Sequence, residues 1–125
     1  MIRKEGNYSQ FSMGLPEPDK QIICSSYIKD RVINNPIEAF RQGSKGPSHD
    51  FKLYAKSWGF ALNEIPAKTM VLVFHGELDK NVPISIVRTM SGDISYCKTH
   101  FYPNEGHISV FINKLDDILS NLLDG

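Results

Sequence analysis

Apolar runs typical of strands and three-four spacings typical of helices follow one another in the second half of the chain. Residues 70–74, Met-Val-Leu-Val-Phe, predict a strand buried on both faces. Residues 98–102 predict a second, more alternating strand. Between them, Pro83 begins a predicted helix with apolar residues at 84, 87 and 90, and Gly92 ends it. A strand, a crossover helix and a second strand of this length imply a right-handed parallel unit.

A closing helix is predicted after the second strand, because the apolar residues there recur at spacings of three and four. They are Ile108, Phe111, Ile112, Leu115, Ile118, Leu119 and Leu122. The order strand, helix, strand, helix predicts the α/β fold class.

The first 20 residues are polar and interrupted by Gly14, Pro16 and Pro18, which predicts a loop-like, flexible N-terminus. Residues 21–64 read as a helical segment, and residues 65–125 as the α/β segment that follows the break at Ile65-Pro66.

Three short helices are predicted within residues 21–58. Ser25 or Ser26 caps the first, and Asn34-Asn35-Pro36 ends it. The second begins with Pro36 in its first turn and stops at Gly43. Ser48 caps the third, in which the apolar residues Phe51, Tyr54, Ala55 and Trp58 form one stripe.

Composition removes several classes of protein from consideration. Fourteen Lys and Arg balance fourteen Asp and Glu, so the clustered cations of a nucleic-acid footprint are not indicated. No apolar run approaches the roughly 20 residues that span a bilayer, and residues 1–7 lack the apolar core of a secretion signal. Cys24 and Cys97 form no C-x-x-C pair. A reduced, cytoplasmic setting is the simplest expectation, with a Cys24–Cys97 bridge left open.

Two chemistry-bearing residues follow the two predicted strands. Asp79 lies in the loop that leads to Pro83, and His107 lies just before the closing helix. An acid there can orient a histidine and stabilise its cation, and the histidine can act as a general base and then as a general acid. For Asp79 the alternative is a helix cap or a solvated side chain; for His107 it is an ordinary histidine near a helix start. An acid and a histidine on consecutive strand-to-helix loops are less common by chance than either alone.

The same residues resemble a known family. Gly76-x-x-Asp79-x-x-x-Pro83 and Glu105-Gly106-His107 look like the last two motifs of the α/β-hydrolase fold. Residues 38–43 and Ser57-Trp58-Gly59-Phe60 resemble the helical lid, and its return to the sheet, in one bacterial branch of that superfamily. The resemblance covers about residues 17–123. It implies a partial α/β-hydrolase fold, with 21–64 as lid-like segment, Asp79 as triad acid and His107 as triad base.

The chain departs from that family in one large respect: no Gly-x-Ser-x-Gly is present. Ser12 follows Gln10-Phe11 where the motif needs a glycine and a buried strand. We therefore expect the C-terminal portion of a serine hydrolase for ester or amide substrates, inactive alone and needing no metal or organic cofactor. Its expected partner is a second copy or the N-terminal hydrolase half, either of which would cover the open edge of the first strand.

Other interpretations stay open at this point. The chain can be a non-catalytic dimerising or partner-binding module in which Asp79 and His107 are relics. It can also be a metal-dependent hydrolase that uses His75, Asp79 and His107. A metal cluster of His75, Glu77, Asp79 and His100 lacks the close ligand spacing of known sites. Neither cysteine has the context of a nucleophile, and Trp58 and Phe60 are expected to serve packing.

Overall fold

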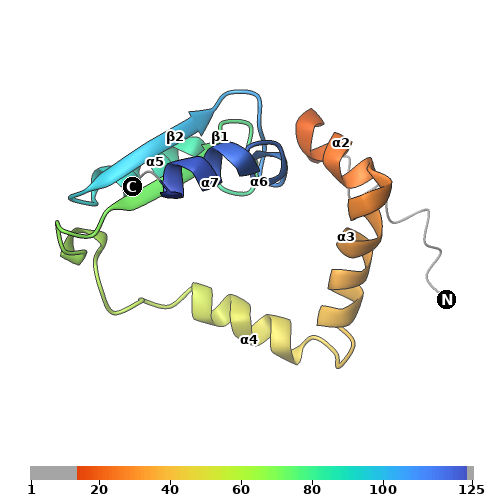
Figure 1. Cartoon of the computed structure of the whole chain (residues 1–125). Helices are drawn as coiled ribbons and strands as arrows, with labels where there is room; N and C mark the ends of the chain where they lie inside the picture. Colours follow the sequence, from red (N-terminus) through yellow and green to blue (C-terminus); the bar gives the residue numbers. More distant parts are fainter. Residues whose placement is uncertain (1–13, 124–125) are drawn as a thin grey trace.

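The computed structural model of the chain describes residues 14–123, except the side chains of Ser26, Tyr27, Lys29, Val32, Ile33 and Pro36. Strands β1 (Val71–Gly76) and β2 (Cys97–Tyr102) pair in parallel, with Val71 opposite Cys97 and Gly76 opposite Tyr102. Helix α5 (Ile84–Gly92) connects them. In Figure 1, α5 lies on one face of this pair and the C-terminal helices lie on the other. The predicted parallel pair is confirmed.

The prediction that the first strand is buried on both faces is wrong. Residues 71–74 are half-buried, and within β1 only His75 and Gly76 are buried. Within residues 14–123, β1 has a neighbouring strand on one edge alone, so its apolar side chains keep part of their surface open.

The predicted closing helix is two helices, α6 (Ser109–Asn113) and α7 (Leu115–Leu123). Lys114, with φ −113° and ψ 13°, interrupts them. α6 packs against β1, while the Tyr102 hydroxyl at the end of β2 donates a hydrogen bond to Asp117 of α7. Burial and then the Asp117 carboxylate raise the pKa of Tyr102 to about 12.

The N-terminal loop prediction is wrong for residues 17–20, which begin helix α2 (Glu17–Cys24). Pro16 is its N-cap and Pro18 lies in its first turn. The missing N–H of proline costs nothing there, because the first N–H groups of a helix have no intrahelical partner. The rest of the predicted loop, residues 1–13 with Ser12, lies outside the described residues.

Two predicted helices are one in the structure. Helix α3 (Ser26–Ala39) runs through Asn34-Asn35-Pro36 without a break. Pro36 falls in the last turn, where a missing N–H removes one bond from a hydrogen-bond ladder that is about to end. Helix α4 (Lys45–Tyr54) begins three residues before Ser48 and ends four before Trp58. A short 3-10 turn, η1 (Leu62–Glu64), precedes β1.

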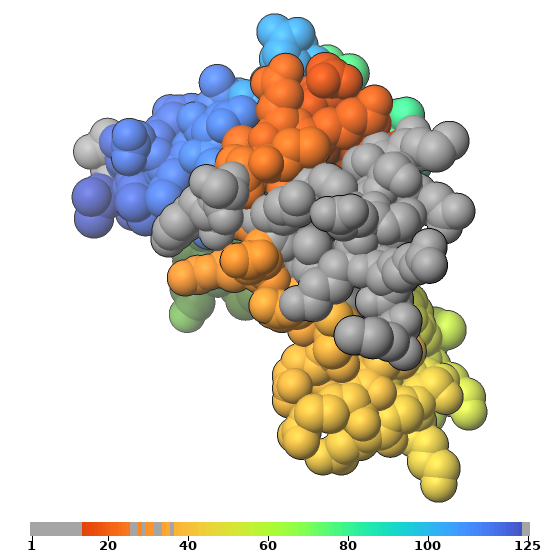
Figure 2. Space-filling view, turned by 90° about the vertical axis from the view of Figure 1, so that its right-hand side faces the viewer, coloured from red at the N-terminus to blue at the C-terminus, as the bar shows by residue number. Residues whose placement is uncertain are grey.

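Helix α4 stands apart from the α/β unit. α3 leads away from the sheet, α4 follows, and an irregular segment returns to β1, so that the ribbon outlines an open frame (Figure 1). In the space-filling view the region of α4 projects beyond the rest of the molecule (Figure 2). The expectation that Trp58 and Phe60 serve packing is wrong for the described chain, because both are exposed. Phe51 and Tyr54 of α4 are exposed as well, Tyr54 by 73%.

Burial concentrates at the rim of the sheet rather than in an apolar core. The buried apolar side chains among the described residues are Ile23, Val87 and Val110. Five polar side chains are similarly buried: His75 of β1, Asp79 and Glu105 of the loops that follow the strands, Asp19 of α2, and Ser109 at the start of α6. No helix within residues 14–123 has the length and apolar character needed to cross a membrane.

Gly76 makes the close approach of these two loops possible. A Cβ added there would lie 2.4 Å from the Glu105 carbonyl oxygen and 2.6 Å from that of Gly106. Both atoms belong to backbone and cannot swing aside. We expect Gly76→Ala to lower the free energy of unfolding by about 1–3 kcal/mol, the usual cost of overpacking, measured by urea denaturation.

Gly92→Ala is the matched control, because a Cβ on Gly92 meets nothing within 4 Å and α5 contains that residue. Its stability should stay unchanged or rise by up to about 1 kcal/mol. Equal stability of Gly76→Ala and wild type would contradict the close approach.

Candidate functional site

The loops after β1 and β2 lie side by side, and their backbones are bonded to each other. The N–H of Glu77 donates to the Tyr102 carbonyl at 2.9 Å, and the N–H of Leu78 donates to the Glu105 carbonyl at 2.9 Å. Parallel strands bring both loops to the same edge of the sheet. The residues that sequence alone placed on consecutive loops therefore meet.

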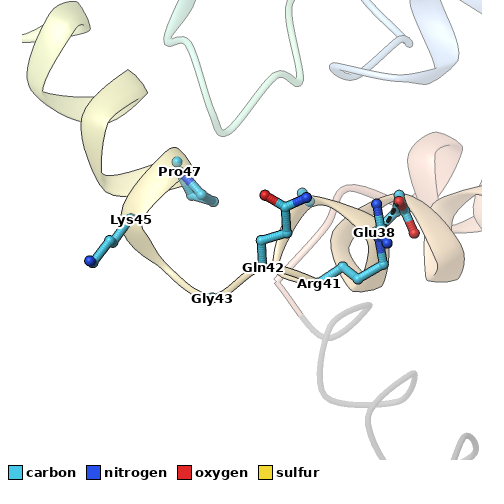
Figure 3. A pocket seen from close by; sticks show the side chains of 8 residues that line it. Glu38, Arg41, Gln42, Gly43, Lys45 and Pro47 are labelled. Atoms are coloured by element: carbon cyan, nitrogen blue, oxygen red, sulfur yellow. Dashed lines mark hydrogen bonds and ion pairs between the residues drawn. The ribbon is translucent and has the colours of Figure 1, made fainter.

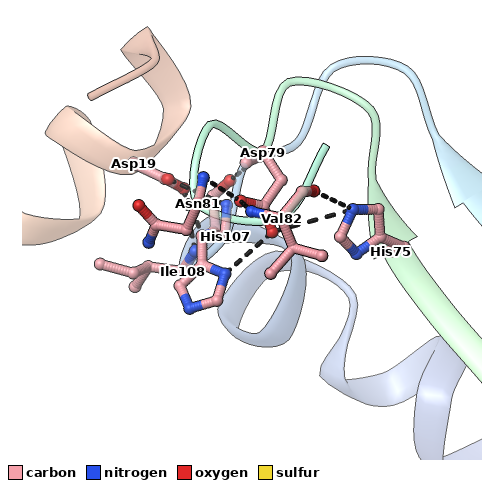
Figure 4. A network of polar contacts seen from close by, with 9 residues as sticks. Asp19, His75, Asp79, Asn81, Val82, His107 and Ile108 are labelled. Atoms are coloured by element: carbon pink, nitrogen blue, oxygen red, sulfur yellow. Dashed lines mark hydrogen bonds and ion pairs between the residues drawn. The ribbon is translucent and has the colours of Figure 1, made fainter. Parts of the chain in front are cut away.

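Asp79 uses its two carboxylate oxygens for two different tasks (Figure 4). Oδ1 accepts hydrogen bonds from the N–H groups of Asn81 at 2.7 Å and Val82 at 2.9 Å, which fixes the turn before α5. Oδ2 accepts from Nδ1 of His107 at 2.8 Å. The side chain is 2% exposed. The structure contains the predicted contact with the histidine. The two alternatives from sequence, a cap of the following helix and a solvated side chain, are wrong, because α5 has Pro83 as its N-cap with no side-chain cap hydrogen bond and Asp79 is buried.

Electrostatics keep Asp79 ionised. Burial by itself raises the pKa of this carboxyl, but the hydrogen bonds from Val82, His107 and Asn81, with the attraction of the His107 charge, outweigh it and lower the pKa below 3.8. An ionised carboxylate only accepts hydrogen bonds, so Nδ1 of His107 carries the proton in this pair.

His107 presents its other ring nitrogen to the outside. With Nδ1 bonded to Asp79, Nε2 of a neutral ring holds a lone pair, and the side chain is 47% exposed. An oriented, accessible imidazole backed by a buried carboxylate can accept a proton from a hydroxyl and return it to a leaving group.

His75 supports the acid loop. Its Nε2–H donates to the carbonyl of Val82 at 3.0 Å and lies 3.8 Å from Oδ2 of Asp79. The residue is buried, and its ring nitrogen is engaged by the same turn that Asp79 caps (Figure 4). Sequence analysis considered His75 only as a metal ligand.

The four side chains considered as a metal cluster, His75, Glu77, Asp79 and His100, do not converge. Glu77 pairs with Arg88 at 3.0 Å, and His100 stacks on Phe74 with ring centroids 4.8 Å apart. Throughout the part of the chain that the structure describes, no group of three or more His, Cys, Asp or Glu is placed to hold a metal ion. Cys24 and Cys97, which sequence left open to pairing, are both free thiols.

Asp19 belongs to the site, and sequence analysis missed it. This fully buried side chain comes from α2. Oδ2 accepts from the N–H of His107 at 2.9 Å, and Oδ1 accepts from those of Ile108 at 3.1 Å and Ser109 at 2.8 Å. The sequence Pro16-Glu17-Pro18-Asp19 indicates only that an acid lies near the start of a helix. It does not show which residues that acid contacts.

Two further polar residues hold the histidine loop. Glu105 is buried, and its carboxylate accepts from the Asn113 amide at 3.0 Å and lies 3.6 Å from the Lys114 ammonium. The Ser109 hydroxyl accepts from the N–H of Gly106 at 2.7 Å. His107 therefore lies on a loop whose buried polar side chains, Glu105 and Ser109, are both hydrogen-bonded.

A separate hollow of about 300 Å³ lies at the turn between α3 and α4, lined by Glu38, Ala39, Arg41, Gln42, Gly43, Lys45, Gly46 and Pro47 (Figure 3). Arg41, one of the two cations in this lining, is paired with Glu38 at 2.7 Å. Its lining includes neither Asp79 nor His107.

Comparisons of this chain with protein-family models, with curated proteins and with solved structures find no match. The local geometry of these two loops is therefore the basis for assigning a function.

The ionised state of Asp79 has a consequence for stability. Its pKa is lower in the fold than the ordinary 3.8, so its contribution to folding is fully present above about pH 3.8 and is lost as the pH falls through the folded pKa. At pH 7 we expect Asp79→Asn to lower the free energy of unfolding by about 1–3 kcal/mol, the usual cost of losing hydrogen bonds to a charged group.

Urea denaturation from pH 7 down to pH 2.5 checks this sign. The difference in the free energy of unfolding between wild type and Asp79→Asn should become smaller as the pH falls. Asp93→Asn, which removes an exposed carboxylate, is the control at each pH. A gap that grows toward acid would show that the carboxyl is not stabilised in its ionised form.

Proposed function

We propose that this chain is the C-terminal portion of a serine hydrolase of the α/β-hydrolase fold, carrying the acid and the base of a catalytic triad. The observation that carries the proposal is the 2.8 Å contact between Oδ2 of Asp79 and Nδ1 of His107. The order acid then histidine, on the loops after two parallel strands, supports it further.

In the proposed reaction, Nε2 of His107 removes the proton from a serine hydroxyl as the oxygen attacks the carbonyl carbon of an ester or amide. Asp79 holds the ring and stabilises the imidazolium that forms. His107 then gives the proton to the leaving alcohol or amine, and a water molecule repeats the sequence on the acyl-enzyme. The 125 residues hold no Gly-x-Ser-x-Gly, so the serine and the oxyanion-binding groups come from outside them.

The remaining expectations from sequence stand with this proposal. Residues 21–64 serve as the lid-like segment, the reaction needs no metal or organic cofactor, and the protein works in the cytoplasm. The isolated chain is inactive, because the nucleophile and the oxyanion donors are both lacking.

Complementation tests the proposal. The chain is co-expressed with the product of a neighbouring reading frame that encodes Gly-x-Ser-x-Gly, and p-nitrophenyl acetate hydrolysis is followed. We expect hydrolysis only when both parts are present, and a loss on the order of 10⁴-fold in His107→Ala and in Asp79→Asn.

His100→Ala, which removes a histidine outside the pair, is the matched control and should keep activity. Turnover by the isolated chain that depends on Asp79 and His107, or turnover by the pair that survives His107→Ala, would refute the proposal. A genome with no such frame nearby would favour the second candidate.

The second candidate is a non-catalytic module that dimerises or binds a partner. Val71 donates to the Tyr96 carbonyl and Glu77 to that of Tyr102, so alternation along β1 directs the N–H groups of Leu72 and Phe74 away from β2. This open edge and the exposed aromatic side chains of α4 both favour association.

If a second copy covers the edge of β1, light scattering should give twice the monomer mass at micromolar concentration. Leu72→Pro removes an N–H that β2 does not use and should yield a folded monomer, because proline is tolerated on edge strands. Lys98→Ala on β2 is the control and should leave the dimer intact. A wild-type monomer under these conditions would contradict association through this edge.

A further inference from the structure

We propose that Asp19 is a positioning residue for His107: its buried carboxylate fixes the backbone of the base so that the ring meets Asp79. This inference rests on the proposed role of His107. Its test does not use hydrolysis, so the two proposals can fail separately.

The environment of Asp19 carries the inference. The side chain is fully buried, and its three hydrogen bonds come from consecutive N–H groups at residues 107, 108 and 109. Hydrogen bonds to an ionised carboxylate are shorter and stronger than neutral ones. Three on consecutive residues define both the position and the direction of that segment.

The surroundings are shaped for this carboxylate. A Cβ on Gly106 would lie 2.5 Å from both oxygens of Asp19. The residue before the base therefore has no side chain at the place where the acid enters. In Figure 4 the Asp19 side chain reaches from α2 toward the backbone of His107, while the His107 ring turns the other way, toward Asp79. The Asp19 carboxylate therefore holds the backbone N–H groups of residues 107–109, and the Asp79 carboxylate holds the ring of His107.

The consequence joins two distant parts of the chain. α2 leads into the lid-like segment, and its Asp19 lies 88 residues before His107. Movement of α2 away from α6 would release the base-bearing loop, so the docked position of the helical segment and the orientation of the base are coupled.

Asp19→Asn makes a selective change. An amide oxygen in the place of Oδ1 keeps the bonds to Ile108 and Ser109, and the amide NH₂ then faces the N–H of His107. The alternative orientation loses two bonds instead of one, so the first is favoured. The variant therefore removes the bond at the base and spares its neighbours.

The readout is the proton on Nδ1 of His107, observed by NMR with the ring ¹⁵N shifts and assigned by its loss in His107→Gln. In wild type we expect this proton to exchange slowly with water and the ring to be protonated at Nδ1. In Asp19→Asn its exchange should be at least about tenfold faster, because one charge-assisted hydrogen bond is worth about that factor.

Gly106→Ala is the second variant, since it displaces the same carboxylate without removing its charge, and it should give the same loss. Two controls accompany them. Glu17→Gln removes an exposed carboxylate from the same helix, and Val110→Ala loosens α6 without touching the amide bonds. Both should keep the exchange rate within about twofold.

Slow exchange retained in a folded Asp19→Asn or Gly106→Ala variant would overturn the proposal. So would an equal loss in Val110→Ala, because the effect would then be general loosening. If both test variants unfold while Val110→Ala folds, Asp19 is needed for folding as such and the positioning role is refuted.

Discussion

The arrangement depends on one constraint: the loops after two parallel strands are bonded backbone to backbone, with no side chain between them. Glu77 donates to the carbonyl of Tyr102 at the end of β2, Leu78 donates to that of Glu105 in the following loop, and Gly76 leaves the space that this contact needs. Asp79 and His107 meet because their loops meet. Each is also held by its own surroundings, Asp79 through the turn it caps and His107 through the N–H that Asp19 accepts.

Hydrogen bonds between buried polar groups hold the loops of this structure in place, where an apolar core would do so in other small domains. An ionised Asp79 inside the molecule is tolerated because two N–H groups and a ring N–H satisfy it, and Asp19 is satisfied by three. A partly bonded network of this kind would cost more than it stabilises. His75, Glu105 and Ser109 hold the two loops that carry Asp79 and His107, so they belong to the site together with that pair.

Sequence predicted what depends on neighbouring residues. The apolar run at 71–74, the helix after Pro83 and the residues that follow each strand are local signals, and together they placed Asp79 and His107 on adjacent loops. The predictions that failed depend on contacts between distant residues or on residues that fit two different structures. Pro16 and Pro18 are compatible both with a loop and with the first turn of a helix, and the local sequence does not decide between the two. Pro36 can end a helix or lie in its last turn, and here too the local sequence does not decide. The contact of Asp19 with residues 107–109 spans 88 to 90 positions, and no pattern within one sequence marks it.

The scarcity of buried apolar side chains in the described chain affects how the protein responds to temperature. The heat capacity change of unfolding grows with the apolar surface that becomes hydrated, and much of that surface is already wet here, on α4, on α7 and along β1. The curve of folding free energy against temperature is therefore shallow. Cooling therefore changes the free energy of unfolding only slightly. A partner that covers these faces would increase both the free energy of unfolding and its dependence on temperature.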